Sequence, residues 1–184
     1  MTTDASGNLH SAARAFGAQS GGATSADVTV REFQPGEGEA FRRLNEEWIS
    51  HYFVLEAKDE EALANPQRTI LDAGGRIFFA VREGLIVGCC ALLAIAPGEY
   101  ELAKMAVTES CRGVGVGRAL LRHAIAEARS AGATRLYLET NHALTPAIRL
   151  YESFGFRHLP PERVVPSRYA RADVFMELFP GEPM

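Results

Sequence analysis

The sequence predicts an α/β domain in which helices cover a mixed central sheet. Segments that alternate between apolar and polar residues, or that are apolar throughout, recur at the length of strands. Between them lie segments whose apolar residues repeat at spacings of three and four, the period of an amphipathic helix. The resulting order, β-α-α-β-β-β-α-β-α-β-β, is that of a sheet covered by helices.

The first third of the chain contains one strand and the helices that follow it. Residues 27–33 alternate in polarity and predict the first strand. A helix is expected from Glu39, because four large apolar side chains share one of its faces. These side chains are Phe41, Leu44, Trp48 and Ile49. Asp59 is expected to cap a short helix, and Pro66 suits the first turn of another.

Three strands are predicted in the middle of the chain, over residues 76–81, 85–95 and 100–107. Glu83-Gly84 is expected to form a tight hairpin turn between the first two. The strand at 85–95 is apolar along nearly its whole length. We therefore expect this strand to be buried on both faces.

Helices and strands alternate in the last third of the chain. A helix is predicted over residues 116–130 and a strand over 134–140. Pro146 begins a further helix, and Phe156 opens a strand after it. The last strand is expected at 173–179, after an irregular segment rich in proline.

The domain organisation follows from composition. Residues 1–26 are rich in Ser, Gly, Ala and Thr, with few large apolar side chains, and predict a flexible tail. Residues 27–184 form one domain, because 184 residues with 47% apolar and 23% charged are ordinary values for a single core.

Charge and cysteine content restrict the class of protein. The net charge is −4, which indicates neither a nucleic-acid surface nor a polybasic membrane patch. No apolar run is long enough to span a bilayer, and no signal-peptide pattern is present, so a cytoplasmic location is expected. Cys89, Cys90 and Cys111 lack C-x-x-C spacing and are expected to be buried and reduced. Cys89 and Cys90 are neighbours on a strand and should point to opposite faces.

The most informative stretch is residues 112–118, which read Arg-Gly-Val-Gly-Val-Gly-Arg between a strand and a helix. Three glycines let the backbone take positive φ and approach a ligand closely. The start of a helix adds free N–H groups and a partial positive charge. The stretch is neither G-x-G-x-x-G nor a P-loop, so it predicts a phosphate site of another kind or a plain helix-capping turn.

This frame of strand, Arg-x-x-Gly-x-Gly and amphipathic helix resembles the pyrophosphate-binding loop of the GNAT acetyltransferase superfamily. Residues 146–156 resemble the second signature of that family, because Tyr151 stands on a predicted helix four residues before Gly155-Phe156. Leu144 stands where the family usually has asparagine. The resemblance covers residues 27–179.

The resemblance implies a mostly antiparallel central sheet with a splayed parallel strand pair, flanked by helices. Acetyl-CoA would lie in the gap of that pair and would bond to strand backbone, much as an added strand does. The residues implied for the coenzyme are Met105, Ala106, Val107, Arg112, Gly113, Val114, Gly115, Val116, Gly117, Arg118 and Asn141. No His, Cys or carboxylate cluster has metal-ligand spacing, so no metal is expected.

Two catalytic residues are implied by the resemblance. Tyr151 would be the general acid that protonates the departing thiolate, and core packing is the alternative for it. Glu101 matches the position of the general base in the histone-acetyltransferase branch, and an exposed strand-end carboxylate is the alternative. Glu139 and His142, near the end of the neighbouring strand, are further candidates for the base.

Aromatic residues mark the expected acceptor site. The candidates are Trp48, Tyr52, Phe53, Glu56 and Tyr169, and core packing is the alternative for each. Arg171 and Asp173, which follow the proline-rich segment and lead into the last strand, are further candidates for contact with the acceptor. Lys104 interrupts an apolar strand and either faces solvent or lines the acceptor site.

These observations predict an N-acetyltransferase that moves an acetyl group from acetyl-CoA to a primary amine in a ternary complex. A catalytically silent acyl-CoA sensor is the alternative, and a nucleotide-phosphate enzyme is disfavoured by the missing P-loop lysine. The expected partner is a small-molecule or peptide amine, without nucleic acid or membrane. The assembly state is open, and a homodimer is one option.

Overall fold

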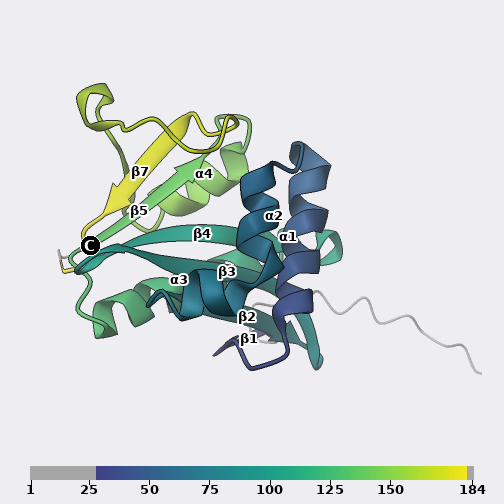
Figure 1. The fold of residues 1–184 in the computed structure, drawn as a ribbon. Helices are drawn as coiled ribbons and strands as arrows, with labels where there is room; N and C mark the ends of the chain where they lie inside the picture. Colours follow the sequence, from purple (N-terminus) through teal and green to yellow (C-terminus); the bar gives the residue numbers. More distant parts are fainter. Residues whose placement is uncertain (1–27, 182–184) are drawn as a thin grey trace, which may run out of the picture.

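The computed structural model describes residues 28–181 and shows a seven-stranded sheet with helices on both faces (Figure 1). The tail predicted at residues 1–26 lies outside the described residues. The strand order in the sheet is β1-β2-β3-β4-β5-β7-β6. The strands are β1 (Val28–Glu32), β2 (Arg76–Arg82), β3 (Leu85–Ala96), β4 (Glu99–Val107), β5 (Arg135–Thr140), β6 (Arg157–His158) and β7 (Val174–Leu178).

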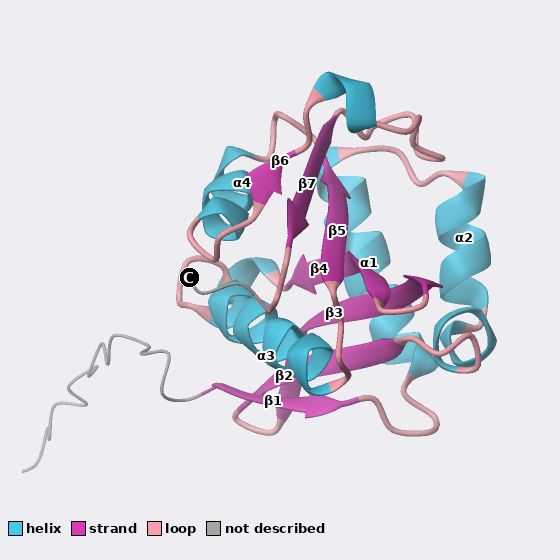
Figure 2. Cartoon of the chain, turned by 90° about the vertical axis from the view of Figure 1, so that its left-hand side faces the viewer, coloured by secondary structure: helices cyan, strands magenta, loops and turns pink. Residues whose placement is uncertain are grey.

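Two separate cores form because each face of the sheet is covered by its own pair of helices (Figure 2). The helices are α1 (Gly38–Tyr52), α2 (Ala57–Ala64), α3 (Val116–Ser130) and α4 (Thr145–Glu152). Apolar side chains of α1 and α2 pack on one face, and those of α3 and α4 pack on the other. Cys89 belongs to the first core and Cys90 to the second, which confirms that they point to opposite faces.

The sheet is antiparallel except at one pair of strands. β4 and β5 run parallel, and their pairing is limited to Glu99–Glu101 of β4 against Arg135–Tyr137 of β5. Beyond these residues the two strands separate, as Figure 2 shows. This topology confirms the mostly antiparallel sheet with a splayed parallel pair.

β4 contains a bulge at Lys104. The register of β4 against β3 shifts between the pairs Cys89↔Ala106 and Ala91↔Ala103. Lys104 has φ 53°, a left-handed value that lysine adopts only under local constraint. The bulge turns the lysine side chain out of the strand's alternating pattern, towards the end of β4 that separates from β5.

Several elements differ in detail from the sequence prediction. The N-cap of α2 is Glu56, and Asp59 is the third helical residue of a reciprocal capping box. The helix expected after Pro66 is a five-residue π-helix, Gln67–Leu71. β3 is buried only in its middle, since Leu85 and residues 94–96 are exposed at the sheet ends. Short 3₁₀ turns lie at Glu109–Cys111 and Pro161–Arg163.

Within residues 28–181, no helix has the length and apolar character needed to cross a membrane. In the same part of the chain, no three His, Cys, Asp or Glu side chains gather as a metal site would require.

Candidate active site

A cavity of about 870 Å³ lies where β4 and β5 separate. Its volume is in the range of small-molecule and cofactor sites. The end of β4, the loop after it and the start of α3 and α4 form one part, which we call the coenzyme half. The end of α1, helix α2, Lys104 and residues 168–171 form the other part, the acceptor half.

The loop in the coenzyme half is shaped by two glycines with left-handed backbone. Gly113 has φ 78°, and Gly115, the N-cap of α3, has φ 94°. The free N–H groups of the first turn of α3 and the helix dipole favour an anion at this point. Gly117 lies inside that turn, where an added Cβ would sit 3.4 Å from Met105 Cε and 3.5 Å from Leu150 Cδ2. Its missing side chain keeps this part of the cavity open.

The two arginines that flank the loop have different surroundings. The Arg112 side chain lines the cavity, donates from Nε to the Val107 carbonyl at 3.1 Å, and donates from Nη1 to the Tyr52 hydroxyl at 3.4 Å. Arg118 is exposed on the outer side of α3, and its guanidinium lies 5.3 Å from the ring centre of Phe154. Arg112 therefore joins the two halves of the cavity, whereas Arg118 is not among the lining residues and contacts Ser153 and Phe154 in the turn after α4.

Tyr151 lies in the wall of the coenzyme half. Helix α4 positions it, and its ring packs edge-on against Phe156 with 5.9 Å between ring centres. Its hydroxyl donates to the Met105 sulfur at 3.8 Å, a weak contact that leaves the oxygen accessible to another partner. Burial, with Cys90 as a second cause, raises the pKa of the Tyr151 hydroxyl above its ordinary value. The phenol therefore keeps its proton at neutral pH.

Glu101 reaches the cavity from the last residue of β4 that pairs with β5. Burial and the neighbouring Glu139 carboxylate raise the pKa of Glu101 to about 7, although Lys104 acts in the opposite direction. A carboxylate with this pKa can accept a proton near neutral pH, which an ordinary glutamate does poorly.

The other candidate bases are occupied by neighbours. Glu139 lines the cavity, but its oxygens accept hydrogen bonds from the Tyr137 hydroxyl at 3.1 Å and from Ser167. The imidazole of His142 lies outside the cavity lining and pairs with Asp173. Glu101 is therefore the candidate base that lines the cavity and is not held by a hydrogen-bond partner within the described residues.

An aromatic cluster at the end of α1 walls one side of the acceptor half. Trp48 packs against Tyr52 and Phe53, with ring centres 5.3 Å and 6.1 Å apart. All three side chains line the cavity, as the sequence predicted for an acceptor site. Tyr52 also stacks under the Arg112 guanidinium at 5.5 Å, so this wall reaches the coenzyme half.

A buried ionic network forms the opposite wall, and the network is defined by Glu56, Asp59, Lys104, Tyr169 and Arg171. Lys104 Nζ donates to Asp59 Oδ1 at 2.9 Å and to the Tyr169 hydroxyl at 3.0 Å. Arg171 donates to both Asp59 oxygens at 2.7 and 2.8 Å and to Glu56 at 2.9 Å. The network joins α2, the bulge of β4 and the segment before β7.

Ionisation of Asp59 depends on these partners. Burial opposes its charge, since the side chain is fully buried, but hydrogen bonds from Arg171 and Lys104 outweigh this effect and lower the pKa of Asp59. Lys104 and Arg171 line the cavity, whereas Asp59 and Glu56 lie behind them. The network therefore presents its cations to the cavity and keeps its carboxylates behind the wall.

The structure brings most of the predicted site residues together. The members of the predicted coenzyme set that line the cavity are Met105, Val107, Arg112, Gly113, Gly117 and Asn141. The Asn141 amide is held on both sides, since Nδ2 donates to the Arg171 carbonyl in the segment before β7 at 2.6 Å and Oδ1 accepts from the Ala143 amide in its own loop. Ala106 and Val116 are buried core residues, and neither is among the lining residues.

Sequence reasoning missed two cationic residues of the lining, Lys58 and Arg168. Both lie in segments without a periodic pattern that would assign a direction to their side chains. The reciprocal capping box of Glu56 and Asp59 marks the start of α2.

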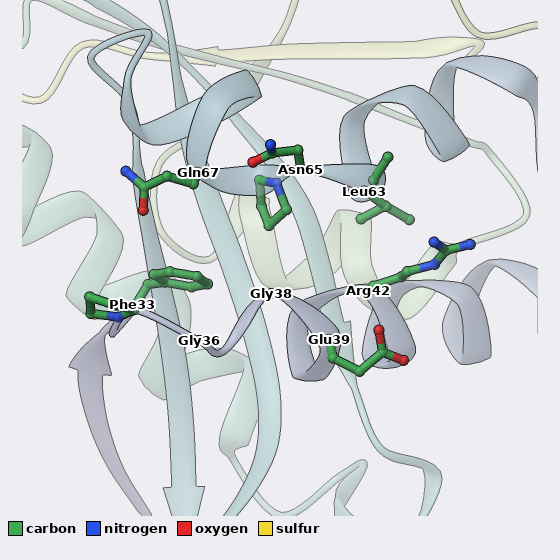
Figure 3. A pocket seen from close by; sticks show the side chains of 11 residues that line it. Phe33, Gly36, Gly38, Glu39, Arg42, Leu63, Asn65 and Gln67 are labelled. Carbon is green, nitrogen blue, oxygen red and sulfur yellow. The ribbon is translucent and has the colours of Figure 1, made fainter.

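A smaller hollow of about 420 Å³ lies between the turn before α1 and the end of α2 (Figure 3). Its charged lining residues are Glu39 and Arg42, and Arg42 is paired with Glu46 at 2.6 Å. Its lining contains a carboxylate, Glu39, but no tyrosine to match Tyr151, so the larger cavity is the candidate active site.

Structural comparison places this fold among acetyltransferases. An acetyltransferase of the GNAT family from Staphylococcus aureus Mu50 superposes with a TM-score of 0.73 at 20% identity, covering 82% of this chain and 97% of that one. A protein from Salmonella typhimurium, solved with its cofactor acetyl-CoA, superposes with a TM-score of 0.67 at 21% identity, covering 85% and 96%. At these identities the comparison shows the fold alone.

Sequence comparison then gives the family. The profile of the Acetyltransferase (GNAT) family matches residues 38–156, so the chain belongs to this family and is an acyltransferase. An uncharacterised N-acetyltransferase of Schizosaccharomyces pombe is 31% identical over 132 residues, which are 69% of this chain and 80% of the relative. The chain spans 46–58% of the length of the next three curated relatives. Members of the family use acetyl-CoA.

Proposed function

We propose that the protein transfers an acetyl group from acetyl-CoA directly to a primary amine, with both substrates bound together. One observation carries this proposal. Glu101 and Tyr151 line a single cavity, and the separated backbone of β4 from Met105 to Val107 lies along it. A proton acceptor, a proton donor and an open strand edge thus meet at one site.

Each group has a defined task in the proposed reaction. Glu101 takes a proton from the ammonium, and the free amine attacks the thioester carbonyl, so a C–N bond forms while the C–S bond breaks. A main-chain N–H near Val107 polarises the carbonyl. Tyr151 gives its proton to the thiolate, and its raised pKa keeps that proton in place until the thiolate forms. The second proton that the nitrogen loses as the amide forms restores the Tyr151 phenol, and Glu101 releases its proton to solvent.

The coenzyme half supports the binding step. The left-handed glycines at 113 and 115 and the start of α3 suit the diphosphate, and Arg112 adds a charge beside them. We further propose that residues 27–184 act as one catalytic domain in the cytoplasm. The three buried free thiols support a reducing compartment.

The experiment is acetylation of an amine panel, with Glu101→Gln compared to wild type across pH. Because the folded pKa of Glu101 is about 7, kcat/KM should rise with pH through that value and level off above it. Glu101→Gln should lower kcat/KM by roughly 100-fold and abolish the rise of kcat/KM with pH (the pH limb). Glu99→Gln, two residues away and outside the cavity lining, is the control.

Product is detected as acetylated amine by mass spectrometry and as released thiol. Retained acetyl-CoA binding without turnover on any amine would contradict the proposal and favour the silent sensor. An unchanged pH limb in Glu101→Gln would remove Glu101 from its role while leaving acetyl transfer in place.

A further inference from the structure

The charge on the cavity wall differs from the charge of the protein. The chain as a whole carries a net charge of −4. The cavity lining instead contains five cationic side chains, Lys58, Lys104, Arg112, Arg168 and Arg171. Its acidic side chains are three, Glu61, Glu101 and Glu139. Arg112 belongs to the coenzyme half, so four of the cations face the acceptor.

The cations at the mouth of the acceptor half lack a neutralising partner. Lys58 and Arg168 are exposed and adjacent, since Lys58 Nζ donates to the Arg168 carbonyl. Among residues 28–181, neither side chain has a carboxylate within the 4.0 Å of an ion pair. An anion at this mouth would therefore gain two charge-assisted contacts without breaking an internal ion pair.

The deeper part of the acceptor half contains a proton acceptor instead of unpaired cations. Glu101 is partly buried there and must receive a proton from the acceptor amine. Glu139, its acidic neighbour, already accepts two hydrogen bonds within the protein. The cavity thus offers a proton acceptor inside and positive charge at its opening, which matches a molecule with an amine at one end and an anion at the other.

We propose that the acceptor is an amine that also carries a carboxylate, with the carboxylate bound at the mouth by Lys58 and Arg168. The inference rests on the proposed N-acetyl transfer and names its substrate class. Lys104 and Arg171 add little to this field, because Asp59 and Glu56 neutralise them at 2.7–2.9 Å. Positive charge near the bound amine also favours its neutral, nucleophilic form.

The first test compares matched acceptors. An ω-amino acid, with its amine and carboxylate at opposite ends, its primary amide and the amine without the carboxyl group are acetylated by the wild type, and kcat/KM is expressed per free amine. The acid should exceed the amide by roughly tenfold, because the lost contacts are charge-assisted but partly exposed. This preference should decrease as salt is raised, because exposed charges are screened.

The second test removes the charges. The double variant Lys58→Gln with Arg168→Gln should lower kcat/KM for the acid by about tenfold and leave the amide within about twofold. Arg157→Gln, exposed on β6 and outside the lining, is the control. Arg168→Lys in place of Arg168→Gln should recover part of the preference.

Binding gives a readout that does not need turnover. Trp48 is the single tryptophan of the chain and lines the cavity, so its fluorescence reports acceptor binding in the presence of coenzyme A. The amino acid should change this fluorescence at lower concentration than its amide. An amide that binds and reacts as well as the acid would overturn the inference, as would an equal loss for both in the double variant. Failure to acetylate any amine would overturn the proposed function instead, and the fluorescence titration would still decide the charge preference.

Discussion

The two halves of the cavity use different means to present functional groups. The coenzyme half is formed largely by backbone, through the left-handed glycines at 113 and 115 and the unpaired edge of β4. The acceptor half is formed by side chains, through an aromatic wall and a buried ionic network. Backbone geometry tolerates few residue types, whereas a side-chain wall can be exchanged residue by residue. Under the proposed function we therefore expect the coenzyme half to be independent of the acceptor and the acceptor half to set the specificity.

The largest expected effect comes from substituting Tyr151, the residue proposed to protonate the departing thiolate. Tyr151→Phe should lower turnover by about 10²–10⁴, the value of a positioned acid, and keep acetyl-CoA affinity. The drop should shrink with a thioester whose thiol is a better leaving group. Tyr100→Phe, outside the cavity lining, is the control. Turnover close to wild type, measured where chemistry limits the rate, would assign Tyr151 to packing.

A substitution at Gly115 tests whether backbone alone builds the coenzyme half. Gly115→Val places a branched side chain at φ 94°, so the loop must change its conformation and its N–H groups no longer point towards the proposed diphosphate position. Acetyl-CoA affinity in calorimetry should fall on the order of 100-fold, equal to the loss of about two charge-assisted contacts.

Gly132→Val is the matched control for that measurement. Gly132 has φ 73° at the other end of α3 and faces open space, so the backbone strain is similar while the loop is untouched. Equal acetyl-CoA affinities in Gly115→Val and Gly132→Val would show that the Gly115 substitution acts through general strain. The contrast between a coenzyme half built by backbone and an acceptor half built by side chains would then fail.

The smallest expected effect concerns the ionic network of the acceptor half. Asp59→Asn removes the charge that holds Lys104 and Arg171, and should lower the free energy of unfolding by about 1.5–3 kcal/mol. The folded pKa of Asp59 is lowered, so its stabilisation is present above its unfolded pKa and is lost as pH falls through the folded value.

Chemical denaturation at neutral and acidic pH measures this contribution. The difference between wild type and Asp59→Asn should narrow in acid, while acetyl-CoA affinity stays unchanged. Glu60→Gln, exposed on the same helix, is the control. A loss of coenzyme affinity in Asp59→Asn would show that the two halves are coupled.

Sequence patterns could place the residues of the glycine loop, α3 and α4, but not the ionic network, for a physical reason. The glycine loop, α3, α4 and Tyr151 lie within continuous segments whose period fixes the direction of each side chain. The ionic network joins α2 to Lys104, 45 residues apart, and to Arg171, 112 residues from Asp59. No local period reports such contacts.

The bulge at Lys104 shows the same limit. A left-handed lysine inside a strand is set by the register against β3, and strict alternation cannot assign its direction. Similarly, the raised pKa of Glu101 depends on burial and on Glu139 from another strand. The sequence could name Glu101 but could not give its environment.

The short pairing between β4 and β5 also affects the stability of the protein in a cell. Three residue pairs join these strands, and the remaining edge of β4 is completed by the bound coenzyme in the proposed complex. Acetyl-CoA then acts as a folding partner, adding about 2.7 kcal/mol of stability at a concentration 100 times its Kd. The rate at which the enzyme is degraded by proteases would therefore depend on the acetyl-CoA concentration in the cell. When acetyl-CoA is scarce, the amount of enzyme would fall as well.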